Sequence, residues 1–141
     1  MRYVLDANVA LKWVLPEADS DKALRLRADT QAGVHELLAP DVFAVEVAHA
    51  LARAERKGDI PVGDAELHLL NILSTSPQFQ PSLAILRRAL AISSAARIGV
   101  YDCLYVALAE REGCELVTAD DKLVKNLLGQ FPFLVPLASL P

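Results

Sequence analysis

The chain has 141 residues, of which 53% are hydrophobic and 23% are charged, a composition typical of a globular protein and not of a disordered one. This length predicts one domain spanning residues 1–141. The formal net charge of −4 argues against binding to nucleic acid through bulk positive charge, so any such contact depends on local basic patches. No run approaches the ~18 consecutive apolar residues of a membrane span and no signal-peptide pattern is present, so we expect a cytoplasmic protein.

Apolar residues recur along the chain with spacings that alternate between those of strands and those of helices. In chain order, the pattern predicts a strand at 2–7, helices at 9–15 and 21–31, a strand at 36–39, helices at 42–57 and 63–74, a loop or short edge strand at 74–81, helices at 82–98 and 101–112, a strand at 115–119, a helix at 122–128 and a strand at 133–137. Strands separated by helices indicate a three-layer α/β/α fold in which a central, mostly parallel sheet lies between helical layers.

Four acidic residues interrupt these apolar elements. Asp6 ends the first strand, and Asp120 directly follows a later strand. Glu46 lies in the middle of a long helix, on the face that also carries apolar side chains, and Asp102 lies in the first turn of another helix. Burying a carboxylate is costly unless a partner or a cation compensates it, so four such positions indicate a common purpose.

The four acids are expected to form one metal site. Ligands of parallel α/β sheets bind beyond the carboxyl ends of the strands, where Asp6 and Asp120 both lie. Mg²⁺ and Mn²⁺ prefer oxygen ligands, whereas His35, His49 and His68 lack the mutual spacing of a metal site. A cation held by carboxylates activates water and neutralises charge on a departing oxygen, which is the chemistry of a metal-dependent nuclease.

Four short motifs carry a family resemblance: residues 3–8, the helix around Glu46, residues 101–109 and residues 116–120. In this order they resemble the motifs of the PIN domain, especially those of the VapC-type toxin ribonucleases of bacterial and archaeal toxin–antitoxin pairs. The resemblance implies an RNA substrate, a homodimer and a small cognate antitoxin protein. It also implies a Mg²⁺- or Mn²⁺-dependent endoribonuclease with catalytic, metal-binding acids and two residues that support them by hydrogen bonding: Asp6, Glu46, Asp102 and Asp120, supported by Asn8 and Thr118.

Simpler roles exist for most of these acids. Asp6 could cap the helix that follows it, Asp102 could complement a helix dipole, and Asp120 could cap the next helix. Asp121 competes with Asp120 for the fourth position, although Asp120 matches the motif better. Glu46 has no capping role in the middle of a helix, so it favours the shared metal site.

Two other functions remain open. A PIN-like module could bind RNA or protein without cleaving it. A phosphatase of the haloacid dehalogenase type also begins with an aspartate after an N-terminal strand, but Asn8 stands where its second aspartate is required.

Outside the acids, Trp13 and Phe43 are expected to be core or interface anchors. Together with the high apolar content, Trp13 indicates a surface meant for burial against a partner. Cys103 and Cys114 are expected on one helix, roughly 16 Å apart, as core residues that do not bridge.

Overall fold

The structure is a computed structural model that describes all residues, 1–141. Its strands and helices follow the predicted order closely, so the alternation seen in the sequence is confirmed. The elements are β1 Arg2–Leu5, α1 Ala7–Leu11, α2 Ser20–Gln31, β2 Glu36–Pro40, α3 Phe43–Arg56, α4 Asp64–Leu73, β3 Gln78–Gln80, η1 Ser82–Ile85, α5 Leu86–Ala96, α6 Val100–Glu112, β4 Glu115–Thr118, α7 Asp121–Leu127, β5 Leu134–Pro136 and η2 Leu137–Ser139, where η denotes a short 3₁₀ helix.

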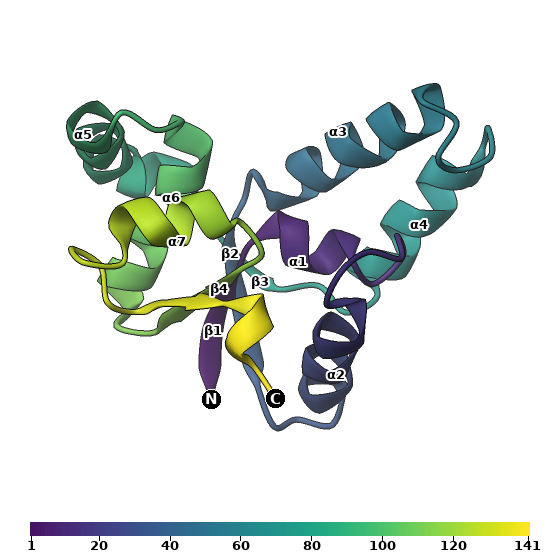
Figure 1. Cartoon of the computed structure of the whole chain (residues 1–141), viewed down its shortest axis with the longest axis horizontal. Helices are drawn as coiled ribbons and strands as arrows, with labels where there is room; N and C mark the ends of the chain where they lie inside the picture. The colour runs from purple at the N-terminus through teal and green to yellow at the C-terminus, as the bar shows by residue number, and fades with distance from the viewer.

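The five strands form one sheet in the order β3-β2-β1-β4-β5, and every neighbouring pair is parallel. Helices α5, α6 and α7 lie on one side of the sheet, and α1 to α4 lie on the other (Figure 1). The predicted α/β/α architecture is therefore confirmed, with a sheet that is parallel throughout.

The strand order of the sheet reverses between β1 and β4. From β1 the chain adds β2 and then β3 on one flank, and it then crosses over to add β4 and β5 on the other flank. In the register of this central pair, Leu5 lies opposite Val117, so the two strands end side by side. Such a switch point opens a crevice beyond the carboxyl ends of the strands, which is where ligands of open α/β sheets bind.

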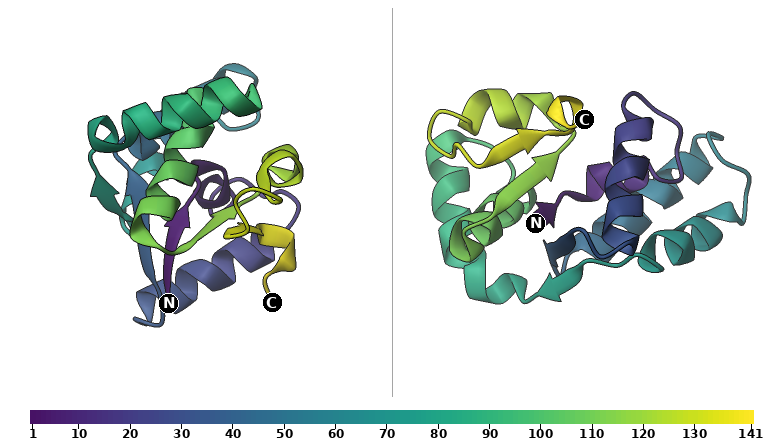
Figure 2. Two further views of the ribbon diagram at one scale, coloured as in Figure 1. Left: turned by 90° about the vertical axis from the view of Figure 1, so that its left-hand side faces the viewer. Right: turned by 90° about the horizontal axis from the view of Figure 1, so that it is seen from below.

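Helix α6 forms the centre of the core. It packs against β1 and β2 on one side and against α5 on the other, as Figure 2 shows from two further directions. Seven consecutive residues, from Cys103 to Ala109, are buried, as expected for a helix enclosed by neighbours. Gly113 ends the helix in the left-handed conformation (φ +63°), which glycine adopts without strain, and the chain turns directly into β4.

The predicted boundaries were wrong in two helices. The helix predicted at 9–15 begins earlier, because Asp6 caps it, and it ends at Leu11 in a series of turns. The helix predicted at 82–98 is divided into η1 and α5, because Ile85 has φ −114° and ψ 3°, outside helical geometry. No helix is both long and apolar enough to cross a membrane.

The environments of Trp13, Phe43 and the two cysteines agree only in part with the predictions. Trp13 is 7% exposed, and its indole N–H donates a hydrogen bond to the carbonyl of Ala23, so it belongs to the core and forms no partner surface. Phe43 is fully buried, as predicted. Cys103 is buried, but Cys114 lies beyond the end of α6 and is only half-buried, because Gly113 has already turned the chain.

Candidate active site

Asp6 stands at the carboxyl end of β1 and is 4% exposed. Its Oδ1 accepts the backbone N–H of Asn8 at 3.3 Å and so caps α1, while its Oδ2 accepts the hydroxyl of Thr118 at 2.9 Å. The capping role considered for this residue is real, but it engages only one oxygen. The second oxygen is held by a residue at the end of β4, which ties together the two central strands.

The hydroxyl of Thr118 makes three hydrogen bonds that connect the ends of the two strands. Its hydroxyl oxygen accepts the side-chain amide of Asn8 at 3.4 Å and the backbone N–H of Asp120 at 3.1 Å, in addition to donating to Asp6. The side-chain oxygen Oδ1 of Asn8 in turn accepts the backbone N–H of Ala119 at 3.0 Å. Asn8 and Thr118 therefore fix where the ends of β1 and β4 lie relative to each other, and they orient Asp6 and Asp120.

Glu46 lies on α3, which packs against α1. It lies in the first turn of α3, so the prediction that it stands in the middle of this helix was wrong, although the helix begins within one residue of its predicted start. Its carboxylate makes no cap; instead, its Oε1 accepts the hydroxyl of Tyr105 at 2.9 Å. Tyr105 is fully buried in α6, so this bond joins helices on opposite sides of the sheet through the site.

Asp102 and Asp120 complete the set. Asp102 lies in the first turn of α6 and is half-buried, and no hydrogen bond holds its carboxylate. Asp120 is the N-cap of α7, where its Oδ1 accepts the backbone N–H groups of Lys122 and Leu123 at 3.0 and 3.1 Å. Its neighbour Asp121 is the exposed first residue of α7.

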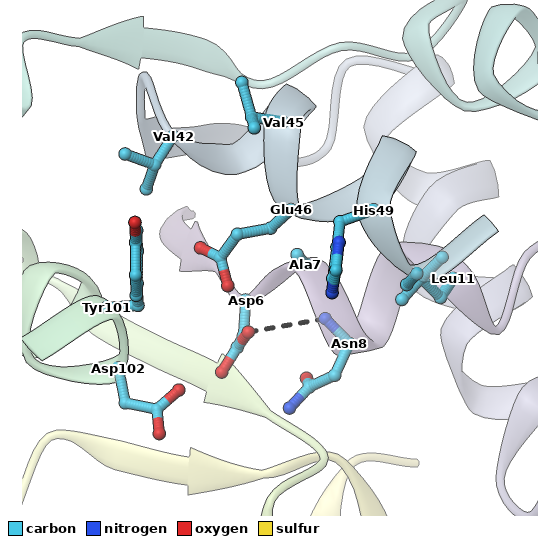
Figure 3. A pocket seen from close by; sticks show the side chains of 11 residues that line it. Asp6, Ala7, Asn8, Leu11, Val42, Val45, Glu46, His49, Tyr101 and Asp102 are labelled. Atoms are coloured by element: carbon cyan, nitrogen blue, oxygen red, sulfur yellow. Dashed lines mark hydrogen bonds between the residues drawn. The ribbon is translucent and has the colours of Figure 1, made fainter. Parts of the chain in front are cut away.

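Three of the acids face one cavity of about 680 Å³ (Figure 3). Carboxylates and amide groups form one part of its wall and apolar side chains another, and neither Lys nor Arg lines it. The lining residues are Asp6, Ala7, Asn8, Leu11, Val42, Val45, Glu46, His49, Ala50, Tyr101 and Asp102. Asp120 is not part of this lining.

Burial and mutual repulsion raise the pKa values of these carboxyls. Burial raises the pKa of Asp6 from 3.8 to about 7, the Thr118 hydrogen bond opposes this rise, and the negative charges of Asp102 and Glu46 add to it. Burial also raises the pKa of Glu46, against the hydrogen bond from Tyr105. The pKa of Asp102 is raised by burial and then by the charge of Asp120. Glu46, Asp102 and Asp120 therefore each raise the pKa of another acid of the set, and the pKa of Asp6 is raised by two of them.

The donor set matches a hard divalent cation. All the acids offer carboxylate oxygen, and none of them forms an ion pair with Lys, Arg or His. A buried, unpaired carboxylate such as Asp6 is unfavourable unless a cation balances it. As the side chains stand, no three of them converge tightly enough to surround an ion. The site thus has the charge and the ligand chemistry for a cation, in a more open arrangement than a closed coordination shell.

Three residues of the site were not found from the sequence. Tyr105 resembles an ordinary core aromatic in an apolar helix, and only the structure shows that its hydroxyl reaches Glu46. His49 lines the cavity one turn after Glu46, a position that the i, i+3 spacing places on the same helix face. Tyr101 also lines the cavity, although its place beside Asp102 was the only sequence signal.

A sequence model of the PIN domain matches residues 3–126, which is most of the chain. The five-stranded parallel sheet and the acids at its switch point thus belong to a protein of known class. The chain belongs to the PIN domain family, and the resemblance noted from its motifs is confirmed.

Curated relatives are similar over nearly the full length. The chain is 33% identical to Ribonuclease VapC3 of Pyrobaculum aerophilum, in an alignment that covers 96% of this chain and 98% of the relative. It is 34% identical to Ribonuclease VapC12 of Mycobacterium tuberculosis over 124 residues, which cover 87% of this chain and 90% of that protein.

Solved structures share the fold. The crystal structure of PAE2754 from Pyrobaculum aerophilum superimposes with a TM-score of 0.69 at 24% identity, covering 99% of this chain and 94% of the other. VapBC2 from Rickettsia felis, crystallised with a DNA fragment from its promoter, gives a TM-score of 0.62 at 16% identity, covering 96% and 97%. At these identities the likeness concerns the fold alone.

Proposed function

We propose that this protein is a metal-dependent endoribonuclease and the toxin of a type II toxin–antitoxin pair. The observation that carries the proposal is the acidic cavity at the switch point of a PIN-domain sheet, in which Asp6, Glu46 and Asp102 face one another without a cationic partner. The curated relatives that match over most of the chain are ribonucleases by name, which supports the choice of RNA as substrate.

Asp6, Glu46, Asp102 and Asp120 are proposed to hold Mg²⁺ or Mn²⁺. When bound, the cation supplies an activated water for attack on phosphorus and neutralises the charge on the departing oxygen. Asp120 is favoured over Asp121 as the fourth acid, because its charge raises the pKa of Asp102. The capping hydrogen bonds from Lys122 and Leu123 reach only Oδ1 of Asp120, so its Oδ2 is available as a ligand.

The chain's own residues prepare this site in three ways. Thr118 orients one oxygen of Asp6 by donating its hydroxyl, and Asn8 keeps the β4 end in place. Tyr105 donates to Glu46 and favours its charged, metal-binding form; burial and the nearby carboxylates raise the pKa of Tyr105 itself, so the phenol keeps its proton. The apolar part of the cavity wall limits water around the carboxylates, which strengthens their hold on a cation.

The proposal is tested by cleavage of a short unstructured RNA by purified protein with Mg²⁺, with Mn²⁺ and with EDTA. We expect cleavage that depends on the cation and that Asp102→Asn abolishes. Asp64→Asn is the matched control, since Asp64 is an acid in the first turn of α4 and does not line the cavity. Cation-dependent RNA binding without cleavage by the wild type would instead indicate a non-catalytic binding module.

The proposed partners are a small antitoxin and a second copy of this chain. The cavity is negatively charged, and Val45 at its rim is 71% exposed, which matches a segment that carries an Arg beside apolar side chains. The planar guanidinium of such an Arg pairs with carboxylates and excludes the cation and the RNA together. Inhibition of this kind needs no chemistry.

A different surface is suited to the second copy. Leu83, Leu86 and Leu90 are exposed by 82%, 39% and 57% and follow one another at spacings of three and four residues along η1 and α5. Leu86 and Leu90 lie about one turn apart on α5, and Leu83 precedes them in η1. Exposed apolar side chains grouped in this way are typical of contacts between chains. We expect a dimer by size-exclusion chromatography, which Leu90→Glu converts to a monomer.

The antitoxin is sought by co-purifying the protein with the product of the adjacent upstream reading frame. We expect a stable complex that does not cleave RNA, and release of activity when the small partner is removed. A strictly monomeric chain that retains no small partner would refute the toxin assignment and leave the nuclease assignment intact.

A further inference from the structure

Tyr101 is an aromatic residue in an unusual position. It is 59% exposed although it lies in the first turn of α6, directly before Asp102. Its side chain lines the acidic cavity, and Figure 3 shows the ring edge-on, with one face turned toward the carboxylate of Glu46. An aromatic face that remains open beside carboxylates is available to a flat ligand.

The Tyr101 ring lies between the carboxylates of the cavity and its apolar part. The Tyr101 side chain extends toward Val42 on α3, and Val45 lies one turn away at the rim, 71% exposed. Neither Lys nor Arg lines the cavity, so it offers a phosphate no permanently charged side chain. A nucleic acid that enters must therefore be held by something other than side-chain cations. Stacking of a base on an aromatic side chain is the usual alternative in single-strand binding.

We propose that Tyr101, with Val42 and Val45, forms a stacking platform for one unpaired nucleobase of the RNA, beside the acidic centre. This inference rests on the proposed ribonuclease function and specifies how that site takes its substrate. A cavity of about 680 Å³ lies within the range that encloses a ligand of nucleotide size. A base on the exposed face of Tyr101 leaves its attached phosphate on the side of Glu46 and Asp102.

The platform implies a preference for unpaired RNA. A base within a duplex is stacked on its neighbours and its faces are not available, whereas an unstacked base in a loop or at an end is free to enter. Stacking depends little on which base is present, because every base has a π face. Tyr101 is thus a substrate-binding residue that selects single strands more than sequence.

The experiment combines variants of Tyr101 with altered RNA. The wild type and the variants Tyr101→Phe, Tyr101→Trp and Tyr101→Leu are compared for KM and kcat on a short unstructured RNA that the wild type cleaves. Because Tyr101 is largely exposed, all variants should fold, and a thermal melt checks this. Val62→Ala is the matched control, since Val62 is an apolar residue with 89% exposure that does not line the cavity.

We expect the aromatic variants and the control to keep the wild-type KM, and Tyr101→Leu to raise it by about tenfold or more. The same RNA is then given a single abasic residue at successive positions. At one position the missing base should raise the KM of the wild type about as much, with no further rise for Tyr101→Leu, because the two changes remove the same contact.

Losses that add at every position of the abasic series would overturn the platform. So would an unchanged KM in Tyr101→Leu together with weaker binding of the antitoxin, which would assign the ring to a protein interface. A wild type that cleaves no RNA fails earlier, and this outcome refutes the proposed function itself.

Discussion

Charged side chains have contrasting surroundings in the acidic cavity and around Arg27 on α2. The Arg27 guanidinium donates hydrogen bonds to three residues at the end of α4: to the Oγ1 of Thr75 at 3.0 Å, to the backbone and side-chain oxygens of Asn71 at 2.6 and 2.9 Å, and to the Oγ of Ser74 at 3.1 Å. It also lies 4.7 Å above the centre of the Trp13 ring.

The two places treat charge in opposite ways. The cation of Arg27 meets neutral acceptors, among them a carbonyl in the last turn of α4, where the helix dipole favours positive charge. The carboxylates of the cavity are buried, repel one another and accept few hydrogen bonds, so their pKa values rise. Arg27 therefore stabilises the fold, whereas the cavity lowers the stability of the free protein in exchange for a place that attracts a cation.

The largest effect is expected for the fourth acid. Asn caps helices about as well as Asp, so Asp120→Asn should remove a negative charge while keeping the cap of α7. The melting temperature of the protein should therefore stay unchanged. Cleavage should fall by about 100-fold or more through loss of metal binding. Asp121→Asn is the control, and it should remain near the wild type. A reversed pattern would transfer the fourth position to Asp121.

The variant Arg27→Ala tests how much the contacts of Arg27 contribute to stability. We expect the free energy of unfolding to fall by about 1 to 3 kcal/mol, since several hydrogen bonds and a cation–π contact are lost. Arg25→Ala removes the same charge from the exposed side of the same helix and should change stability by less than about 0.5 kcal/mol. Equal losses in urea unfolding of the two variants would mean that Arg27 contributes only charge.

The effect of the cavity on stability is tested by the pH dependence of the melting temperature of Asp6→Asn in EDTA. The pKa of Asp6 is about 7 in the folded protein, against 3.8 as its ordinary value. Between these values the folded state holds the proton more tightly, so wild-type stability falls as pH rises through this window and remains reduced above it.

Asn at position 6 removes this titration and keeps an oxygen for the cap of α1. The melting temperature of Asp6→Asn, relative to the wild type, should therefore rise between about pH 4 and pH 8 by roughly 3 °C or more. A difference that is the same at every pH would contradict the account, because it would reflect lost hydrogen bonds alone.

The smallest effect is expected for Tyr105→Phe. The hydroxyl of Tyr105 lowers the pKa of Glu46, so its removal should raise that pKa further. Glu46 then protonates at higher pH, and the acidic limb of the pH–rate profile for cleavage should shift upward, with less than about a tenfold loss of rate above it. Tyr101→Phe removes a hydroxyl that bonds to no acid and should leave the profile in place.

The sequence predicted the parts of the site that follow from strand ends. Asp6 and Asp120 could be placed because parallel strands end at one edge of a sheet, and Glu46 because an acid is costly among apolar neighbours. Tyr105 could not be found, because a buried tyrosine looks like any core aromatic until its hydroxyl is seen to reach Glu46.

Other features escaped prediction because they depend on tertiary contacts. Trp13 was expected to be a core or interface anchor and was also taken to indicate a partner surface, because apolar patterns do not tell whether a side chain packs within its own chain or against another. The place of Glu46 in the first turn of α3 was also missed, although the helix begins within one residue of its predicted start. The one-domain extent over residues 1–141 stays a prediction.

The central claim is that the acidic cavity binds a divalent cation through its carboxylates. Crystals soaked in Mn²⁺ and measured at the manganese absorption edge test it directly, with Asp102→Asn crystals as the control. We expect an anomalous peak between the carboxylates of Asp6, Asp102 and their neighbours, absent or much weaker in the variant. A cavity without anomalous signal, in a protein whose cleavage of RNA persists in EDTA, would contradict it.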